Sequence, residues 1–193
     1  MRTYTTVEEE RKAFAIVMAN DAHPERGAIY PVYDDNLELL HFNRWSPSEG
    51  LYELWYPTGQ LHSRFYVALA GERYGLIEVW HDNGQLGGRG TYKDGLLDGL
   101  CERWSPTGQL EERATYKAGK LEGLCEEWYD NGQLYERCSY KDDKLDGLCE
   151  RWHDNGQLIS RITYKAGVRD GLCEMWNNGQ LEERSTYEAG RKL

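Results

Sequence analysis

The chain has 193 residues, of which 39% are hydrophobic and 29% charged, with 21 Gly, 14 Tyr and seven Trp. So many regularly spaced aromatic residues exclude a disordered chain, and they favour short strands joined by turns. The net charge of −10 disfavours nucleic acid and anionic membranes as partners, because both bind mainly through Lys and Arg. A basic protein partner fits this charge, and so does plain solubility.

Residues 1–27 predict an N-terminal helix that caps the rest of the chain. Thr5 or Thr6 can cap the helix, and an apolar stripe that includes Phe14 and Val17 follows. The longest apolar run of the chain, AFAIVMA, is too short to cross a bilayer, and the glutamates before it do not suit a signal peptide. We therefore expect a cytoplasmic protein with no membrane insertion.

Residues 28–49 resemble a degenerate first repeat. The stretch YDDNLEL stands there where later units have HDNGQL. Together with the helix, this unit is expected to cover the N-terminal edge of the sheet, because a repeat array needs its terminal edge protected. The C-terminal GRKL offers a less obvious cap, so a partner or a second copy of the chain, as in a homo-oligomer, can dock at an open C-terminal edge.

Residues 50–193 contain six tandem repeats of about 24 residues, such as GLCERWSPTGQLEERATYKAGKLE. Two residue columns mark the repeats most clearly. The first column is Trp55, Trp80, Trp104, Trp128, Trp152 and Trp176, and the second is Gly84, Gly108, Gly132, Gly156 and Gly179, each followed by Gln-Leu. Such spacing indicates structural positions of a repeated scaffold, since one unit buries little surface without its neighbours.

Each repeat predicts two strands joined by a three-residue loop, because Pro-Thr-Gly or Asp-Asn-Gly suits a type I turn followed by a left-handed Gly. Counting outward from this loop gives four pairs: Ser105 with Gln109, Trp104 with Leu110, Glu102 with Glu112, and Leu100 with Ala114. Leu100, Trp104, Leu110 and Tyr116 then share a packing face, and Cys101, Arg103, Glu111 and Arg113 take the other. The prediction is an all-β, elongated, twisted, single-layer antiparallel sheet of β-hairpins, roughly 55–60 Å long, with a short N-terminal helical cap.

Four of the five cysteines first suggest a zinc site. These four recur every 24 residues: Cys101, Cys125, Cys149 and Cys173. Neighbours in this column are two strands apart, about 9–10 Å, which is too far for one zinc ion or a disulfide. Cys138 is irregular: the three-residue loop places it opposite Leu124, whereas a two-residue loop places it opposite Cys125 and allows a bridge. Turn chemistry and the expected compartment favour five free thiols.

One Glu and one Arg recur in every repeat. Such a column does not form a catalytic pair, because a catalytic pair needs a unique geometry and a pocket. If the second turn closes near Gly119, Arg113 lies opposite Glu126 and starts a ladder of charge pairs between the repeats. This pairing conflicts with Glu on the packing face unless a bulge exchanges the faces, and the sequence leaves both arrangements open.

We expect no catalytic, metal or cofactor site, because the sequence lacks the usual motifs. The stretch GGRG, residues 87–90, indicates a place where a backbone or partner can approach the sheet. Positions that vary between repeats are better candidates for partner recognition, although ordinary surface drift explains them equally well. The candidates are Tyr135, Ile159, Met175, Arg103 and Arg151.

The repeat resembles the variant MORN repeat, including that of the YwqK-family antitoxin proteins. The shared residues are an aromatic, Asn-Gly, Leu and Tyr-Lys-x-Gly-Lys, as in Trp128, Asn131-Gly132, Leu134 and Tyr116–Lys120. The resemblance implies a non-enzymatic module for protein–protein interaction, including neutralisation of a toxin by binding. The alternative is a scaffold subunit of an oligomeric or viral assembly, or a host-interaction protein.

Overall fold

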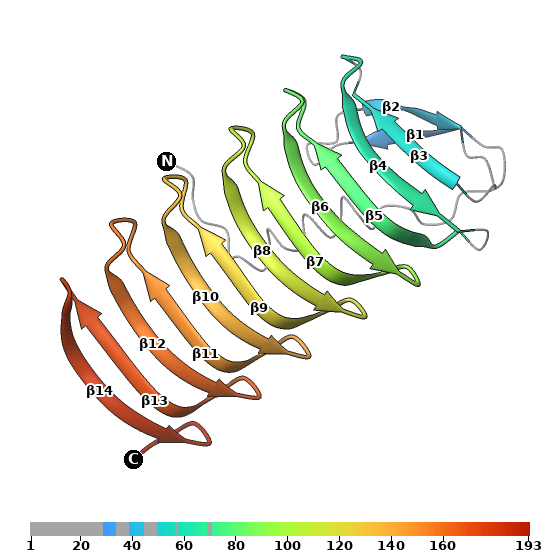
Figure 1. Ribbon diagram of the computed structural model, residues 1–193. Coiled ribbons are helices and arrows are strands. Elements are labelled where there is room, and N and C mark those ends of the chain that lie inside the picture. The colour runs from blue at the N-terminus through green and yellow to red at the C-terminus, as the bar shows by residue number, and fades with distance from the viewer. Residues whose placement is uncertain (1–28, 34–38, 45–49, 57, 69–70) are drawn as a thin grey trace.

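The computed structural model describes residues 29–33, 39–44, 50–56, 58–68 and 71–193 (Figure 1). The described residues form fifteen strands and no helix. The strands are β1 (Ile29–Tyr33), β2 (Leu39–Arg44), β3 (Gly50–Trp55), β4 (Leu61–Val67), β5 (Arg73–Trp80), β6 (Leu86–Lys93), β7 (Leu96–Trp104), β8 (Leu110–Lys117), β9 (Lys120–Trp128), β10 (Leu134–Lys141), β11 (Lys144–Trp152), β12 (Leu158–Lys165), β13 (Val168–Asn177), β14 (Gln180–Glu188) and β15 (Arg191–Lys192). The helix predicted in residues 1–27 lies outside the described residues.

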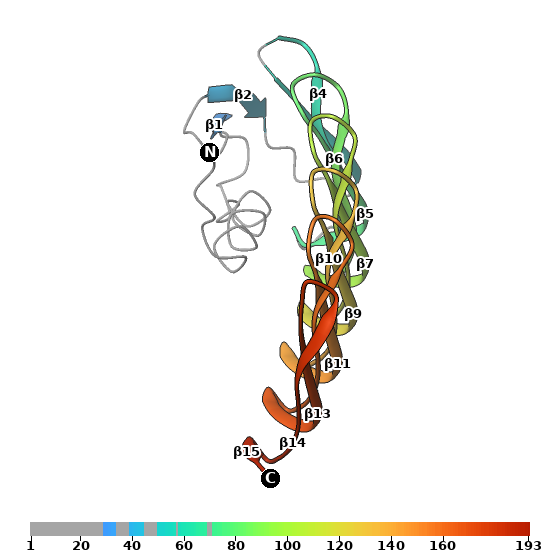
Figure 2. The same ribbon diagram turned by 90° about the vertical axis from the view of Figure 1, so that its left-hand side faces the viewer.

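Strands β3 to β15 form one open antiparallel sheet in which every strand pairs with its neighbours in sequence. Seen from the side, this sheet is a thin, twisted band, as the repeat pattern predicts (Figure 2). Strands β1 and β2 pair with each other in a separate two-stranded sheet. The assignment of residues 28–49 as a degenerate first repeat therefore stays a prediction. Among the described residues no helix is long and apolar enough to cross a membrane.

Two kinds of turn alternate along the sheet. The three-residue loop is confirmed: the Ser105 backbone N–H donates to the Gln109 carbonyl at 2.8 Å, and Gly108 has a φ of 83°. The second turn has two residues, as between Lys117 and Lys120, where Ala118 and Gly119 have φ values of 48° and 79°. Positive φ at both central residues defines a type I′ turn, whose twist matches that of the flanking strands.

A β-bulge next to each three-residue loop changes the predicted register. Trp104 pairs with Leu110 as predicted, but Arg103 then pairs with Glu112, so that Glu111 is an extra residue on β8. The predicted pairs of Glu102 with Glu112 and of Leu100 with Ala114 are therefore wrong. The observed pairs beyond the bulge are Glu102 with Arg113, Cys101 with Ala114, and Leu100 with Thr115.

The bulge also changes which side chains share a face, because side chains alternate along a strand. We call the side that carries Leu100, Glu102, Trp104 and Arg113 and their equivalents the tryptophan face. The side that carries Cys101, Arg103, Glu112, Ala114 and Tyr116 and their equivalents is the cysteine face. Arg113 and Tyr116 are thus on the opposite faces from those predicted.

The buried apolar residues lie on the cysteine face, so the prediction that the tryptophan face is the packing face is wrong. One cluster consists of Phe65, Ile77 and Tyr92, and a second of Ala114, Leu121 and Cys125. Within the part of the chain that the structure describes, the buried apolar residues are Phe65, Ile77, Tyr92, Cys101, Ala114, Leu121, Cys125, Cys138, Cys149, Ile162 and Cys173. Five of these eleven residues are cysteines, whose small side chains fit where residues of neighbouring strands stand next to one another.

The GGRG stretch allows close approach, but the approaching groups are side chains of the same sheet. A Cβ atom on Gly87 would lie 2.9 Å from the His81 ring, and one on Gly90 would lie 3.1 Å from Leu97. The His81 ring nitrogen Nε2 also lies 2.8 Å from the Trp104 carbonyl oxygen of the next repeat. These glycines therefore make room for contacts within and between repeats.

Candidate interaction faces and a thiol cluster

The tryptophan face carries a row of exposed leucines, one from each repeat. Leu100 pairs with Thr115 across the β7–β8 hairpin, at the same position as every other leucine of the row. The row consists of Leu51, Leu76, Leu100, Leu124, Leu148 and Leu172, whose exposed fractions lie between 38% and 50%. A row of apolar side chains that crosses the whole sheet is unlike scattered exposed leucines, and extended apolar surface marks an interaction site.

A ladder of charges runs beside the leucines. Glu102, which is 3% exposed, accepts hydrogen bonds from Arg89 Nε at 2.7 Å and Arg113 Nε at 3.0 Å. The Arg89 guanidinium also lies over the Trp104 ring, 5.4 Å from its centre. The same Arg–Trp contact recurs for Arg64 on Trp80, Arg113 on Trp128, Arg137 on Trp152 and Arg161 on Trp176. The arginines of the ladder thus lie over five of the six column tryptophans and leave the leucines exposed.

The predicted charge pair between repeats is confirmed. Arg113 pairs in register with Glu126, and Arg113 Nη1 lies 4.0 Å from a Glu126 carboxylate oxygen. Arg64, Arg113 and Arg161 each contact one Glu of their own hairpin and one Glu of the next. Because these contacts fill a structural role in every repeat, the Glu and Arg columns belong to the scaffold.

The five predicted partner-binding residues lie on the cysteine face, near the three-residue loops. Arg103 pairs with Glu111 and lies 3.5 Å from Glu112, and Arg151 pairs with Glu136. Tyr135 is half buried, with its ring at a steep angle to Tyr129 and 5.1 Å from it. Ile159 and Met175 are also half buried. Partner binding by these residues stays a prediction, and the leucine row on the other face was missed.

Cysteine positions form one continuous row across the cysteine face. In register, the row reads Cys101, Ala114, Cys125, Cys138, Cys149, Ile162, Cys173 and Ser185. A residue of the intervening strand therefore separates the regularly spaced cysteines, as predicted. Cys138 fills one of these intervening positions, so it stands beside Cys125 on one side and beside Cys149 on the other.

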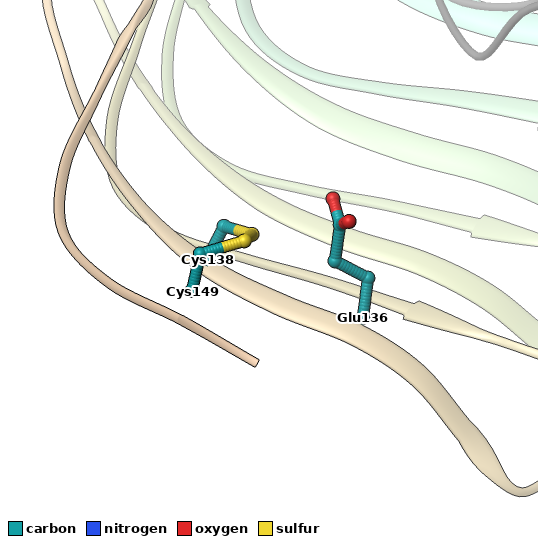
Figure 3. A group of neighbouring side chains, drawn as sticks. All are labelled: Glu136, Cys138 and Cys149. Carbon is teal, nitrogen blue, oxygen red and sulfur yellow. A yellow bond between two sulfur atoms is a disulfide. The ribbon is translucent and has the colours of Figure 1, made fainter. Parts of the chain in front are cut away.

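Cys138 and Cys149 form a disulfide between β10 and β11, with their Cα atoms 4.0 Å apart (Figure 3). The expectation of five free thiols is therefore wrong. The bulge moves Cys138 by one position relative to the predicted register, away from Leu124 and into the cysteine row. The remaining cysteines, Cys101, Cys125 and Cys173, lie outside the disulfide and are buried.

Glu136 extends this thiol pair into a cluster of three ligand-type side chains. One carboxylate oxygen of Glu136 and the sulfurs of Cys138 and Cys149 all lie within 4.8 Å of one another. Arg151 Nε donates a short hydrogen bond to Glu136. Burial lowers the pKa of Arg151, but the hydrogen bond and the charge of Glu136 raise it more, so its pKa lies above the ordinary value. Arg151 thus keeps its positive charge beside the cluster.

Cys101 shows how the cysteine face affects a thiol outside the cluster. Burial, followed by the negative charge of Glu112, raises the pKa of Cys101 to about 12. Because only the thiolate is a good nucleophile, this thiol is poorly reactive near neutral pH. Cys101 is therefore suited to packing.

The fold defines the class of protein: a repeat protein whose 24-residue hairpins stack into one open sheet. Four segments match the MORN repeat variant, at residues 48–67, 97–118, 121–142 and 145–166. The chain is a MORN-variant repeat protein. MORN repeats are non-enzymatic modules that are generally associated with binding to proteins or membrane lipids. The comparison with curated proteins finds no match.

Proposed function

We propose that this chain is a non-enzymatic module that binds a protein partner through the tryptophan face. The observation that carries the proposal is the row of six leucines, each 38% to 50% exposed, at one position of every repeat. Their recurrence shows that the sheet holds these side chains at fixed intervals. Because β3 to β15 form a single sheet, no strand of this sheet packs over them.

Burial of the leucine row contributes favourably to the free energy of binding. Full burial of a Leu side chain contributes about 1.5–3 kcal/mol, so burial of the remaining exposed half contributes about 1 kcal/mol per leucine. Several neighbouring leucines can therefore form the apolar centre of an interface, and the Glu–Arg ladder beside them supplies a polar rim.

The spacing of the row suggests what the partner presents. Successive leucines are two strands apart, which corresponds to about 9.6 Å. Apolar residues seven positions apart on an α-helix are about 10.5 Å apart. An amphipathic helix that lies along the row can therefore place one apolar side chain near each leucine, as in other helix-in-groove complexes.

A protein is favoured over a lipid surface as the partner. The net charge of −10 opposes binding to anionic membranes, and the Arg side chains of the tryptophan face are already paired with Glu. A basic protein segment fits the charge better. Neutralisation of a partner, as in an antitoxin, and service as a scaffold subunit are two biological forms of the same binding activity.

Affinity purification from the native source, with quantitative mass spectrometry, tests the proposal with matched variants. The test variant carries Leu100→Glu, Leu124→Glu and Leu148→Glu. The control carries Leu96→Lys and Val168→Lys, at positions that are equally exposed but outside the row and that hold Lys120 and Lys144 in other repeats. Because all these side chains are exposed, both variants are expected to fold, which circular dichroism checks.

We expect the row variant to capture at least ten-fold less partner than the wild type, and the control to capture as much as the wild type. A partner captured equally by both variants would overturn the proposal, as would loss caused instead by Tyr135→Ser, Ile159→Ser and Met175→Ser on the cysteine face. Co-sedimentation with anionic vesicles that depends on the leucine row would replace the protein partner by a membrane. Rescue of a toxin by co-expression, or copurification within an assembly, then separates neutralisation from a scaffold role.

A further inference from the structure

We propose that Glu136, Cys138 and Cys149 form a binding site for a thiophilic divalent cation such as Zn²⁺ when the Cys138–Cys149 disulfide is reduced. The site lies on the cysteine face, between β10 and β11 (Figure 3). It is independent of the leucine row, which lies on the opposite face. The proposal departs from the sequence-based expectation that the chain has no metal site.

The first argument is that the cluster depends on one departure from the repeat. In the other repeats, the position of Cys138 holds a residue without a thiol: Phe65, Gly90, Ala114, Ile162 and Ser185. The repeat therefore explains Cys149 but does not require Cys138. Because Cys138 is the residue that brings thiols of adjacent strands together, its presence needs an explanation beyond the scaffold.

The second argument is geometry. Zinc binds Cys sulfur at about 2.3 Å and carboxylate oxygen at about 2.0–2.2 Å, so ligand atoms around one ion lie roughly 3.5–3.8 Å apart. The three ligand atoms here already lie within 4.8 Å of one another. They come from two paired strands, where Glu136 pairs with Arg151 and Cys138 with Cys149. Small side-chain rotations after the S–S bond breaks are therefore sufficient to gather them.

The third argument is the charge and burial of the cluster. Cys138, Cys149 and Glu136 are 1%, 5% and 9% exposed, so two thiolates and a carboxylate there require positive charge nearby. A divalent cation neutralises two of the three charges, and the Arg151 guanidinium compensates the third. The hydrogen bond from Arg151 to Glu136 also orients the carboxylate, as outer groups commonly do around metal ligands.

The two states are linked by a balanced two-electron reaction. Two low-molecular-weight thiols reduce the disulfide, so that the protein S–S bond breaks, one S–S bond forms between the reductants, and each Cys gains one proton. Binding of Zn²⁺ then displaces these two protons, because the thiolate is the ligand. Reoxidation of the pair by a small-molecule disulfide removes both sulfur ligands and releases the cation.

Zinc titration of the full-length protein tests this site. The protein is reduced with a phosphine, which takes up oxygen from water and leaves two thiols without adding a thiol that competes for zinc. Bound zinc is measured by elemental analysis after desalting and by competition with a chromogenic chelator. We expect about one equivalent in the reduced protein and less than a tenth of an equivalent in the oxidised protein.

Variants distinguish this site from adventitious thiol binding. Cys138→Ala should abolish binding without unfolding the sheet, because Ala114 occupies the same position in the preceding repeat. Glu136→Gln should weaken binding at least ten-fold. The matched controls lie outside the cluster: Glu112→Gln changes the column of Glu136, and Cys173→Ser changes the column of Cys149. Both should bind as the wild type does.

Three results would overturn the proposal: less than a tenth of an equivalent in the reduced wild type, undiminished binding in Cys138→Ala, or an equal loss in Cys173→Ser. Substitution by Co²⁺ gives a second readout, because thiolate ligation produces an intense near-ultraviolet charge-transfer band. That band should appear in the reduced wild type and be absent from Cys138→Ala.

Discussion

Replacement of Glu102 by Gln removes one negative charge from the Glu–Arg ladder while keeping the size of the side chain. Glu102 is 3% exposed and accepts hydrogen bonds from Arg89 and Arg113, one from each flanking strand. It therefore joins β6, β7 and β8 within the sheet. Gln can accept one of these bonds through its amide oxygen, but its amide NH₂ group then faces the second guanidinium.

The expected loss follows from the number and exposure of these bonds. A hydrogen bond to a charged group contributes about 1.5–3 kcal/mol net, and two such bonds give an upper bound of about 3–6 kcal/mol. Arg89 and Arg113 have side chains that are 48% and 45% exposed, so water recovers part of this energy. We expect the free energy of unfolding to fall by about 1.5–2.5 kcal/mol.

Glu53→Gln provides the matched control. Glu53 occupies the same column in β3, but its side chain is 35% exposed, and it accepts a hydrogen bond from Arg64 at 3.1 Å. The control should lose about 0.5 kcal/mol or less. Urea unfolding followed by circular dichroism measures the difference. Amide hydrogen exchange in β7 shows whether the loss is local, as expected for a sheet built of repeats. Equal losses in both variants would refute the argument from burial.

Three further predictions concern the turns and a buried thiol. Ala118→Gly should raise the free energy of unfolding by about 0.5–1 kcal/mol, because Ala118 has a φ of 48°; a lower urea midpoint would contradict this. Asn131→Ala should lower the free energy of unfolding by about 1 kcal/mol, because the Asn131 side chain accepts from the Gln133 N–H at 3.0 Å and donates to the Asp154 carbonyl at 2.7 Å. Amide hydrogen exchange at both loops should become faster, and unchanged exchange would contradict this. Cys101 should react with iodoacetamide at pH 8 at least about a hundred-fold more slowly in the native protein than in urea. The reason is that burial raises its pKa to about 12, whereas only the thiolate reacts readily. Equal rates in the two conditions would contradict this.

The repeat period was sufficient to predict the architecture. A spacing of 24 residues between tryptophans, with two strand signals and two turn signals in each unit, leads to a meander of hairpins. The three-residue loop followed from its turn residues, and the pair of Arg113 with Glu126 followed from counting across the second turn. These features depend on local chemistry, which the sequence carries directly.

The faces were not predicted, because they depend on whether one extra residue interrupts the pairing. A strand has a side-chain period of two, so a single bulge residue such as Glu111 exchanges the faces of everything beyond it. The sequence did contain a signal. Without the bulge, Glu102 lies directly opposite Glu112, and two like charges in this arrangement are unfavourable. The bulge pairs Glu102 with Arg113 instead, which brings opposite charges together.

One register shift explains both the missed leucine row and the missed thiol cluster. Without the bulge, Leu100 is assigned to a packed face and Cys138 to a position beside Leu124. With it, Tyr116 moves to the cysteine face while Leu100 stays exposed on the tryptophan face, and Cys138 enters the row between Cys125 and Cys149. The same bulge recurs in every hairpin with a three-residue loop, and in each it pairs the Glu column with the Arg column. Once the faces are correct, the recurring leucines indicate a binding surface, and the single non-recurring cysteine indicates a separate chemical site.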